Sequence, residues 1–511
     1  MLKIARRNET VTCLLLITLL AAILRFWNIM ALGLWPSDAG TYVRMSTWLL
    51  GLGGIPMDWG PPLYSFSVAV AMLVFGAADY VATGVSAFFG VVSVILTFFL
   101  GRQIFDERTG LVASLLVAVT EYHIVFSRVA IVDIATTVFY TLSFITFYAA
   151  FTKRKTLYYV MFGICFGLSM LTKYLAFLCF AAPLLFIAFV YLVRFRDRKL
   201  KMKDVLFDRK GMFIAAVIAA VMYMPWVFAM GIGSYMSSGH ASQFSLSSVD
   251  PGWVLENSAT IFKYGIDEQI YVFTHNYSDG IEVTNDPAFY FMVLPIWVSP
   301  LILLFFLYSL GGIGGDGWKS LFLLIWILTI LIFVTFFVTL KGARLLLPAV
   351  VPICVLASRG ILSIKDRRLL LGAIALIALT SIALSANTIA SVHDGYRNAG
   401  NYIDENVGSG DLIFYTGMPQ ILFYHETNTG NWWRAGDKDT VKDIDYVILQ
   451  YHKSQNKYLD VERFERDFDP IATFYNDDPW EEVLHLSQKI PDYERIDIYK
   501  VDRDISGYFK L

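Results

Sequence analysis

The chain has 511 residues, of which 56% are hydrophobic and 16% are charged, and its formal net charge is −2. A soluble protein of this length carries roughly a quarter charged residues, and the charge balance does not point to a nucleic-acid partner. The apolar residues gather into many separate runs, several of them close to the ~20 residues that cross a bilayer. This composition excludes an ordinary soluble enzyme and predicts an α-helical polytopic membrane protein.

The first apolar run, residues 11–27, follows a basic start and has two interpretations. It ends in Arg25-Phe26-Trp27, a sequence typical of a helix end at the membrane interface. A cleaved signal peptide is the alternative, because the small-x-small triplet Ala31-Leu32-Gly33 follows. The run is long for a signal core, so we expect a retained first helix.

About eleven spans are predicted along the chain from their apolar length. They are residues 11–27, 80–100, 110–128, 131–151, 157–173, 174–193, 211–230, 288–309, 320–340, 344–362 and 369–389. Basic residues cluster at 3–7, 102–108, 153–155, 194–210 and 365–368. By the positive-inside rule these clusters are cytoplasmic, so the N-terminus is expected inside and everything after residue 390 outside.

Residues 61–78 are also apolar, but the charge rule argues against a further span there. Residues 28–60 follow the first span and lie outside, whereas residues 101–109 lie inside, and the span 80–100 already supplies the one crossing between them. The segment begins with Pro61 and Pro62 and contains polar residues. Pro61–Gly76 is therefore predicted to be a membrane-surface or re-entrant helix.

The composition changes near residue 390, after which more than half of the acidic residues occur. Residues 1–390 are predicted to form the transmembrane domain and 391–511 a small extracytoplasmic α/β domain. Helices are expected at 396–406 and 461–468, and strands at 411–415, 446–449 and 496–501. The loop 231–287 is long for an unstructured connection, so we expect short helices that cover a site.

Ionisable residues collect at the predicted external ends of the spans, where they are candidates for function. Asp38 lies just beyond the first span and opens a predicted helix at 40–50, where its alternative role is an N-cap. His123, Arg128 and Asp133 mark the turn between two spans. An Arg128–Asp133 ion pair that only joins two helices is the alternative for that turn.

Lys173, Lys341 and Arg344 are basic residues on the predicted external face, against the charge rule. Snorkelling to lipid headgroups is the alternative reading of these cations. Cations can hold a phosphate and stabilise it as a leaving group, and a carboxylate can take a proton from an incoming hydroxyl. With Asp38 and Asp133 on the same face, the pattern predicts a site for a phosphate-bearing ligand.

Six short motifs, in order along residues 10–362, resemble the GT-C superfamily of membrane glycosyltransferases. The branch in question contains protein O-mannosyltransferases and the aminoarabinose transferase of lipid A. The motifs run from Asp38 to Tyr42, Pro61 to Tyr64, Leu100 to Phe105, His123 to Asp133, Gly167 to Lys173 and Arg344 to Pro348. Each motif alone is weak, but six in sequence are specific for the fold and the reaction class.

The resemblance implies a polyprenyl-phosphate-linked sugar as donor, attacked with inversion by an acceptor hydroxyl outside the cytoplasm. It implies that Asp38 is the general base or orients the acceptor, and that Asp133 supports the site. Lys173 and Arg344 would contact the lipid phosphate. The remaining family positions are His123 and Arg128 as further phosphate or sugar contacts, and Tyr42 and Tyr64 as residues that shape the groove.

Some features depart from relatives of this superfamily. Many relatives have Asp-Glu in the first loop, but Ala39 follows Asp38 here, so only Asp58 could supply a second carboxylate. Trp432-Trp433 is followed by Arg434, and the oligosaccharyltransferase sequence Trp-Trp-Asp-Tyr-Gly is absent. The four cysteines lie inside apolar runs without metal spacing. We expect no cofactor; a divalent metal is the alternative that the sequence leaves open, and the resemblance implies that Asp133 would help to hold it, as in metal-using relatives.

Two other classes of function are open from the sequence. A transporter or flippase for a lipid-linked glycan should carry polar or broken helices near the bilayer midplane, whereas the charges here lie at one face. A non-catalytic membrane subunit, with the external domain as its working part, is the second alternative.

Overall fold

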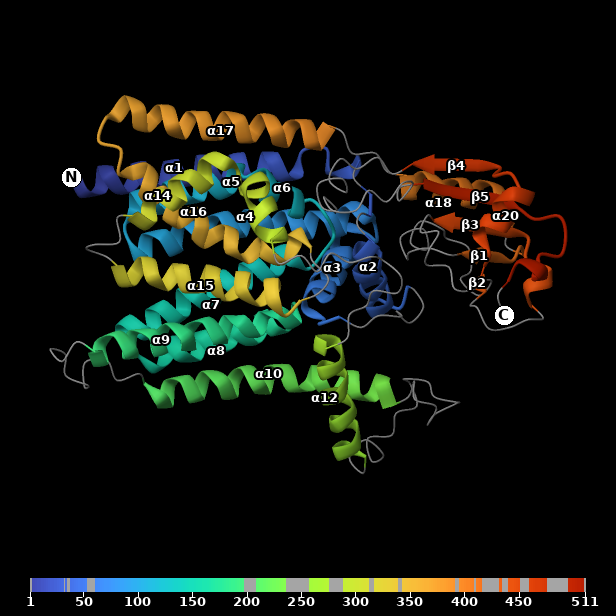
Figure 1. Ribbon diagram of the computed structural model, residues 1–511, viewed down its shortest axis with the longest axis horizontal. Coiled ribbons are helices and arrows are strands. Elements are labelled where there is room, and N and C mark those ends of the chain that lie inside the picture. The colour runs from blue at the N-terminus through green and yellow to red at the C-terminus, as the bar shows by residue number, and fades with distance from the viewer. Residues whose placement is uncertain are drawn as a thin grey trace.

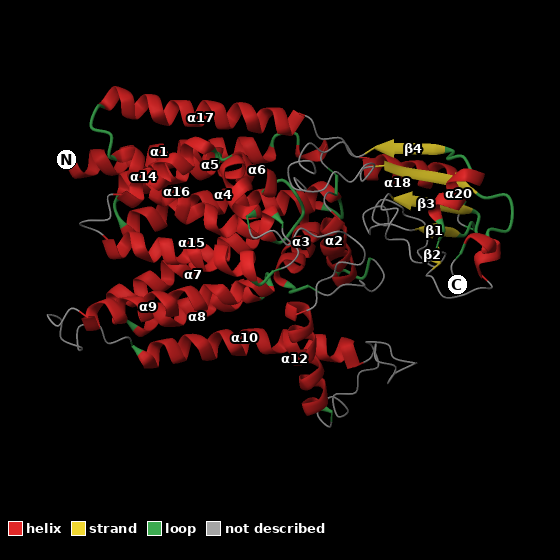
Figure 2. Cartoon of the chain, in the orientation of Figure 1, coloured by secondary structure: helices red, strands yellow, loops and turns green. Residues whose placement is uncertain are grey.

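The computed structural model describes residues 2–31, 33–34, 37–52, 60–196, 208–235, 257–274, 288–311, 317–338, 342–390, 395–408, 410–415, 432–433, 440–450, 459–475 and 495–509. A bundle of long helices makes up most of the molecule, and a small α/β domain lies beyond one end of it (Figure 1). Within the described part, strands occur only in this C-terminal domain (Figure 2).

The membrane domain is helical throughout its described residues. Its elements are α1 (Leu2–Phe26), η1 (Ile29–Ala31), α2 (Ser37–Leu49), α3 (Leu63–Phe75), α4 (Asp79–Ile104), α5 (Glu107–Val119), α6 (Glu121–Phe126), α7 (Asp133–Lys153), α8 (Thr156–Met170), η2 (Tyr174–Phe177), α9 (Leu178–Arg196), α10 (Arg209–Tyr235), α12 (Ser258–Thr274), α13 (Phe289–Val298), α14 (Pro300–Gly311), α15 (Gly317–Phe336), η6 (Ala343–Leu346), α16 (Leu347–Leu362) and α17 (Arg367–Ala390). Among the described residues, eight helices are long and apolar enough to cross a bilayer, built from α1, α4, α7, α9, α10, α15, α16 and α17. The protein is therefore an integral membrane protein that crosses the bilayer several times.

The other three predicted spans take different forms. The stretch 110–128 divides into α5 and α6 at Thr120, whose backbone is extended and whose hydroxyl donates to the carbonyl of Leu116 at 2.6 Å. The stretch 157–173 is a helix of 15 residues, α8. The stretch 288–309 is bent between α13 and α14 at Ser299, the residue before Pro300, where a helical backbone is disfavoured.

Helix α3 covers the segment that the charge rule excluded as a span. Its 13 residues extend about 20 Å, less than the ~30 Å hydrocarbon core of a bilayer. It lies with α2 at the end of the bundle that faces the C-terminal domain (Figure 1). This short helix at one end of the bundle fits the predicted surface or re-entrant helix.

The start of α1 and the C-terminal domain lie at opposite ends of the bundle (Figure 1). The connections from α4 to α5, from α7 to α8 and from α16 to α17 return to the end at which α1 begins. These connections carry basic residues such as Arg102, Lys153 and Arg367. The basic residues of these three connections therefore lie at one end of the bundle, and the orientation that the positive-inside rule gives this end stays a prediction.

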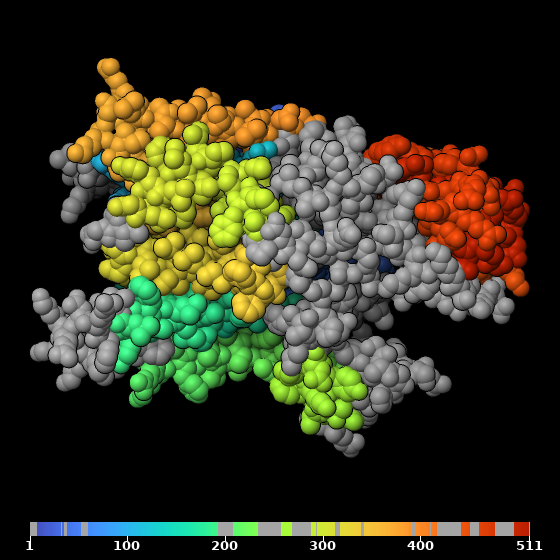
Figure 3. Space-filling model, viewed as in Figure 1, coloured from blue at the N-terminus to red at the C-terminus, as the bar shows by residue number. Residues whose placement is uncertain are grey.

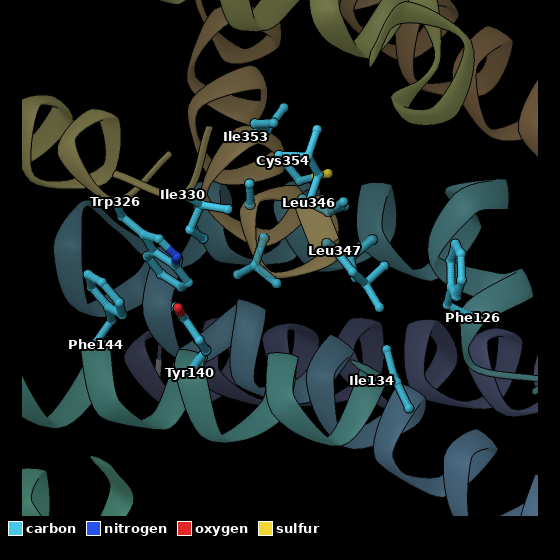
Figure 4. Packing of buried hydrophobic residues seen from close by; sticks show 14 of the residues in the cluster. Phe126, Ile134, Tyr140, Phe144, Trp326, Ile330, Leu346, Leu347, Ile353 and Cys354 are labelled. Carbon is cyan, nitrogen blue, oxygen red and sulfur yellow. The ribbon is translucent and has the colours of Figure 1, made fainter. Parts of the chain in front are cut away.

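Aromatic side chains fill the centre of the bundle between α7, α15 and α16. Trp326 of α15 stacks on Phe144 of α7, with 3.9 Å between ring centroids and 8° between ring planes. Tyr140 lies one turn away and also stacks on Trp326 (Figure 4). α16 is buried along most of its length, so it lies in the core of the bundle.

The C-terminal domain is a five-stranded sheet with helices on both faces. Its elements are α18 (Gly395–Asn406), β1 (Ile413–Tyr415), β2 (Trp432–Trp433), η8 (Thr440–Asp443), β3 (Tyr446–Gln450), α20 (Val461–Asp467), β4 (Ala472–Tyr475), β5 (Arg495–Lys500) and η10 (Ser506–Tyr508). The strand order is β2-β1-β3-β5-β4, with β1 parallel to β2 and β3 and with β5 antiparallel to β3 and β4. α18 packs on one face and α20 on the other. The predicted helices and three predicted strands are present, and β2 and β4 are additional.

The C-terminal domain is joined to the membrane domain by a charged contact. Arg397 of α18 binds the carboxylate of Asp79 at the start of α4, with Nη2–Oδ2 and Nε–Oδ2 distances of 2.5 and 3.1 Å. The same guanidinium donates to the carbonyl of Met30 at 2.9 Å. The described part of the domain forms a separate lobe at this end in the space-filling view (Figure 3).

Candidate active site

An ion pair joins the first and last parts of the membrane domain. Asp38 lies in the first turn of α2, and Arg344 lies in η6, the short turn that leads into α16. The guanidinium of Arg344 donates directly to the Asp38 carboxylate, although the two residues are 306 positions apart. The Asp38 side chain remains 40% accessible and that of Arg344 31%. Asp38 therefore faces a cation while staying open to an incoming molecule.

A second ion pair lies deeper in the protein. Asp133 is the first residue of α7, and its Oδ1 atom lies 2.5 Å from the Nζ atom of Lys173, the residue before η2. The Asp133 side chain is only 3% accessible. Its other oxygen, Oδ2, is buried and has no hydrogen-bond partner among the described residues. The structural Arg128–Asp133 pair considered from the sequence is not formed, because Lys173 takes that position.

The two ion pairs belong to one electrostatic cluster. Burial works against the charged form of Asp38, but the charges of Arg344 and, more weakly, Lys173 hold the pKa of this carboxyl below its ordinary value. Arg344 in turn interacts with the charge of Asp133 as well as with Asp38. The two cations therefore favour the ionised form of the Asp38 carboxyl.

Two tyrosines border the cluster. Tyr42 lies one turn after Asp38 on α2, and its ring meets the ring of Tyr64 edge-on at 5.5 Å. Burial, and then the charges of Asp38 and Asp133, raise the pKa of Tyr42 well above its ordinary value, which keeps this phenol protonated. The Tyr64 hydroxyl bonds to Ser86 Oγ at 2.8 Å. The role that the resemblance implies for both tyrosines, shaping a groove, stays a prediction.

His123 and Arg128 lie in a different buried network, centred on Arg25. One guanidinium nitrogen of Arg25 is 2.8 Å from His123 Nδ1, and its Nε donates to Ser127 Oγ at 3.2 Å. Arg128 donates to the carbonyl of Arg25 at 2.9 Å. The helix end predicted at Arg25-Phe26-Trp27 is present, since α1 ends at Phe26, but the Arg25 side chain is fully buried while Trp27 is 68% exposed. The network joins α1 to α6, so phosphate contact by His123 and Arg128 stays a prediction without support from this geometry.

An apolar groove starts at Phe177, four residues after Lys173 in the chain. It has a volume of about 530 Å³, and its walls come from η2 and α9 on one side and from α15 and the residue after it on the other. Its lining runs from Phe177 to Leu192, which is about 22 Å along a helix axis. The sequence analysis missed this feature, since nothing in a local pattern shows which two apolar helices leave a gap between them.

Some predicted features lie outside the described residues or lack a structural test. Asp58 and Lys341 fall outside the described residues, as do large parts of the loop 231–287, in which α12 supplies one helix. In the described part of the chain, no group of three or more His, Cys, Asp or Glu side chains is arranged to hold a metal ion.

Comparison with known proteins connects this arrangement to a class of enzymes. Residues 60–228, which include Tyr64, Asp133 and Lys173, match the dolichyl-phosphate-mannose-protein mannosyltransferase family. A comparison with curated protein sequences gave no match. Among solved structures, ArnT from Cupriavidus metallidurans in the apo state is similar, with 12% identity and a TM-score of 0.67 over 97% of this chain and 98% of that chain. ArnT bound to undecaprenyl phosphate gives 12% identity and a TM-score of 0.64 over 96% and 98%.

The archaeal oligosaccharyltransferase AglB from Archaeoglobus fulgidus, in complex with an inhibitory peptide and a dolichol-phosphate, is also similar. Its identity is 14% and its TM-score 0.60, over 87% of this chain and 69% of that chain. The chain therefore shares its fold with these membrane glycosyltransferases, and the family match over residues 60–228 agrees with the GT-C resemblance carried by the six motifs. The predicted helical membrane fold with a small C-terminal sheet is confirmed.

Proposed function

We propose that the protein transfers a sugar from a polyprenyl-phosphate donor to an acceptor hydroxyl at the end of the bundle that faces the C-terminal domain. The observation that carries this proposal is the cluster of Asp38, Asp133, Lys173 and Arg344 beside an apolar groove. The cluster suits a sugar phosphate, and the groove suits a hydrocarbon chain. A ligand with both parts is a polyprenyl-phosphate sugar, and the acceptor class (protein, glycan or glycolipid) is left open.

The chemistry follows from the charges. Asp38 accepts the proton of the acceptor hydroxyl as its oxygen attacks the anomeric carbon from the face opposite the phosphate. The bond between the anomeric carbon and the phosphate oxygen breaks, and the polyprenyl phosphate leaves with the electron pair. Lys173 and Arg344 stabilise the charge that develops on the phosphate. The new bond forms on one face of the anomeric carbon while the bond to the phosphate breaks on the opposite face, so the configuration inverts.

The basic connections at the opposite end of the bundle support an extracytoplasmic location for this reaction. Because they are expected in the cytoplasm, the cluster and the C-terminal domain would lie outside it. The two carboxylates of the cluster each face a cation of the same chain. This arrangement supports the proposal that the reaction needs no metal and no other cofactor.

The proposal is tested by incubating the purified protein with a panel of polyprenyl-phosphate sugars and measuring released lipid phosphate. We expect release with one class of donor, and only when a hydroxyl acceptor is present. Excess EDTA should change the rate less than twofold. Donor binding without release would favour the transport alternative, and loss of activity with EDTA, restored by a divalent metal, would contradict the metal-free mechanism.

Filling the groove should weaken the use of long-chain donors. Ala181 lines the groove, and Ala181→Trp places a large ring in the volume that we assign to the prenyl chain. We expect KM for an undecaprenyl-linked donor to rise at least tenfold, because the apolar area buried by the chain is lost. A donor with a two- or three-isoprene chain provides the comparison, since it reaches less far into the groove. An equal effect on both donors would place the chain elsewhere.

A further inference from the structure

The two cations of the site stand on similar backbone turns. Lys173 immediately precedes η2, which leads into α9, and Arg344 lies in η6, which leads into α16. Both side chains are long and flexible, so their positions depend on how firmly each turn is held. A cation that must meet a phosphate with an accuracy of about 0.5 Å needs a fixed backbone.

Buried phenol groups hold both turns. The hydroxyl of Tyr140, on α7, donates to the carbonyl of Leu175 in η2 at 3.0 Å. The hydroxyl of Tyr122, on α6, donates to the carbonyl of Ala343, the residue before Arg344. Both tyrosines are fully buried. Each cation is therefore within two residues of a backbone carbonyl that a buried tyrosine holds.

A third tyrosine contacts the Arg344 turn from the other side. The hydroxyl of Tyr290, on α13, lies 3.3 Å from the backbone nitrogen of Gly342 and 3.4 Å from its carbonyl oxygen. Trp297 connects the two tyrosines through Phe289. Its ring stacks on Tyr122 at 5.6 Å and meets Phe289 at 5.9 Å, and Phe289 in turn meets Tyr290 at 5.1 Å. Two tyrosines of one continuous group of aromatic rings thus hydrogen-bond to the backbone of the Arg344 turn.

The aromatic group around η2 is equally well anchored. Tyr140 stacks on Trp326, which itself stacks on Phe144 (Figure 4). Such stacked rings have few rotamers and are fixed by their packing. The packing of the core therefore fixes the hydroxyls of Tyr122 and Tyr140, and their hydrogen bonds fix the backbone of η6 and η2.

We propose that Tyr122 and Tyr140 are positioning residues for sugar transfer, with Tyr290 assisting Tyr122, and that they set the positions of Arg344 and Lys173 toward the donor phosphate. This inference rests on the proposed function, because it assigns the phosphate as the group that the two cations meet. The tyrosines act through the backbone of the turns and touch no reacting atom.

The test measures binding of undecaprenyl phosphate to the detergent-solubilised full-length protein by isothermal titration calorimetry. Tyr122→Phe and Tyr140→Phe each remove one hydroxyl and keep the ring. Loss of a hydrogen bond to a buried carbonyl should weaken binding about tenfold. Tyr148→Phe is the matched control, because Tyr148 is a buried tyrosine of the same helix as Tyr140 whose ring stacks on Trp318.

Double variants separate positioning from general destabilisation. Tyr122→Phe should weaken binding no further in an Arg344→Ala background, but should still weaken it in a Lys173→Met background. Tyr140→Phe should show the reverse pattern. If a tyrosine variant unfolds, Tyr290→Phe provides the same comparison at the Arg344 turn, and thermal melting of each variant verifies its fold.

Equal effects of each tyrosine in both backgrounds, or unchanged affinity in the single variants, would overturn the positioning role while leaving the proposed function intact. Failure of the wild-type protein to bind undecaprenyl phosphate or a dolichyl phosphate would instead contradict the proposed function, and this inference with it.

Discussion

Replacing Asp38 with asparagine should lower the rate of sugar transfer by about 10² to 10⁴, the usual contribution of a general base. Asparagine keeps the shape of the side chain but cannot accept the proton of the acceptor hydroxyl. The Asp38–Arg344 pair is partly accessible, so its loss should change the free energy of unfolding by only about 0–1 kcal/mol. Transfer is measured as labelled sugar in the acceptor, at equal amounts of folded protein.

Glu107→Gln provides the control for this variant. Glu107 pairs with Arg102 at 3.2 Å near the opposite end of the bundle, with side chains 41% and 50% accessible. Glu107→Gln therefore removes a carboxylate from an ion pair of similar exposure. The rate of sugar transfer in this variant should stay within twofold of the wild-type rate. Wild-type turnover in Asp38→Asn would refute the general-base assignment.

Replacing Lys173 with methionine should affect both stability and activity. The substitution leaves the Asp133 carboxylate buried without its cation, and breaking a buried pair in this way destabilises a protein by about 3–5 kcal/mol. It also removes one of the two groups that we assign to the phosphate. We expect a lower melting temperature and a KM for the donor that is at least tenfold higher.

The double variant Lys173→Met with Asp133→Asn separates these two effects. Asparagine removes the uncompensated charge, so most of the lost stability should return. Transfer should stay low, because the phosphate still lacks its cation. Recovery of activity together with stability would show that Lys173 acts only as the partner of Asp133, and would remove it from the binding site.

The sequence was informative about which charged residues gather at one end of the bundle. Alternating spans and basic clusters predicted that Asp38, Asp133, Lys173 and Arg344 share one face, and the structure brings these four together. The partner of each residue could not be predicted. Ion pairs between residues 40 or 306 positions apart depend on how the helices pack, which no local pattern records.

Local patterns also failed where packing overrides propensity. The helix end at Arg25-Phe26-Trp27 could be predicted, but the sequence did not show that the Arg25 side chain turns inward to His123 and to backbone carbonyls. Strand β2 has only two residues, too few to show a strand period. The bend at Ser299 was missed, because the long apolar run predicted one continuous span. The Ser299-Pro300 step is a local signal that favours a break there.

The tyrosine contacts to the two turns show a further limit of sequence reading. Tyr122 and Tyr140 lie in apolar stretches, where a tyrosine is unremarkable without its partner. Only the structure shows that their hydroxyls reach Ala343 and Leu175. The sequence motifs identified the charged residues, but they could not identify the tyrosine hydroxyls that bond to the backbone beside them.

Photo-crosslinking with a polyprenyl phosphate that carries a diazirine in its first isoprene units tests the central claim most directly. The phosphate should lie at Lys173 and Arg344 and the chain in the groove, so labelled peptides should come from α9 and α15. Unlabelled polyprenyl phosphate should compete for this labelling. Labels confined to α10 or α17, or labels unaffected by the competitor, would contradict the account.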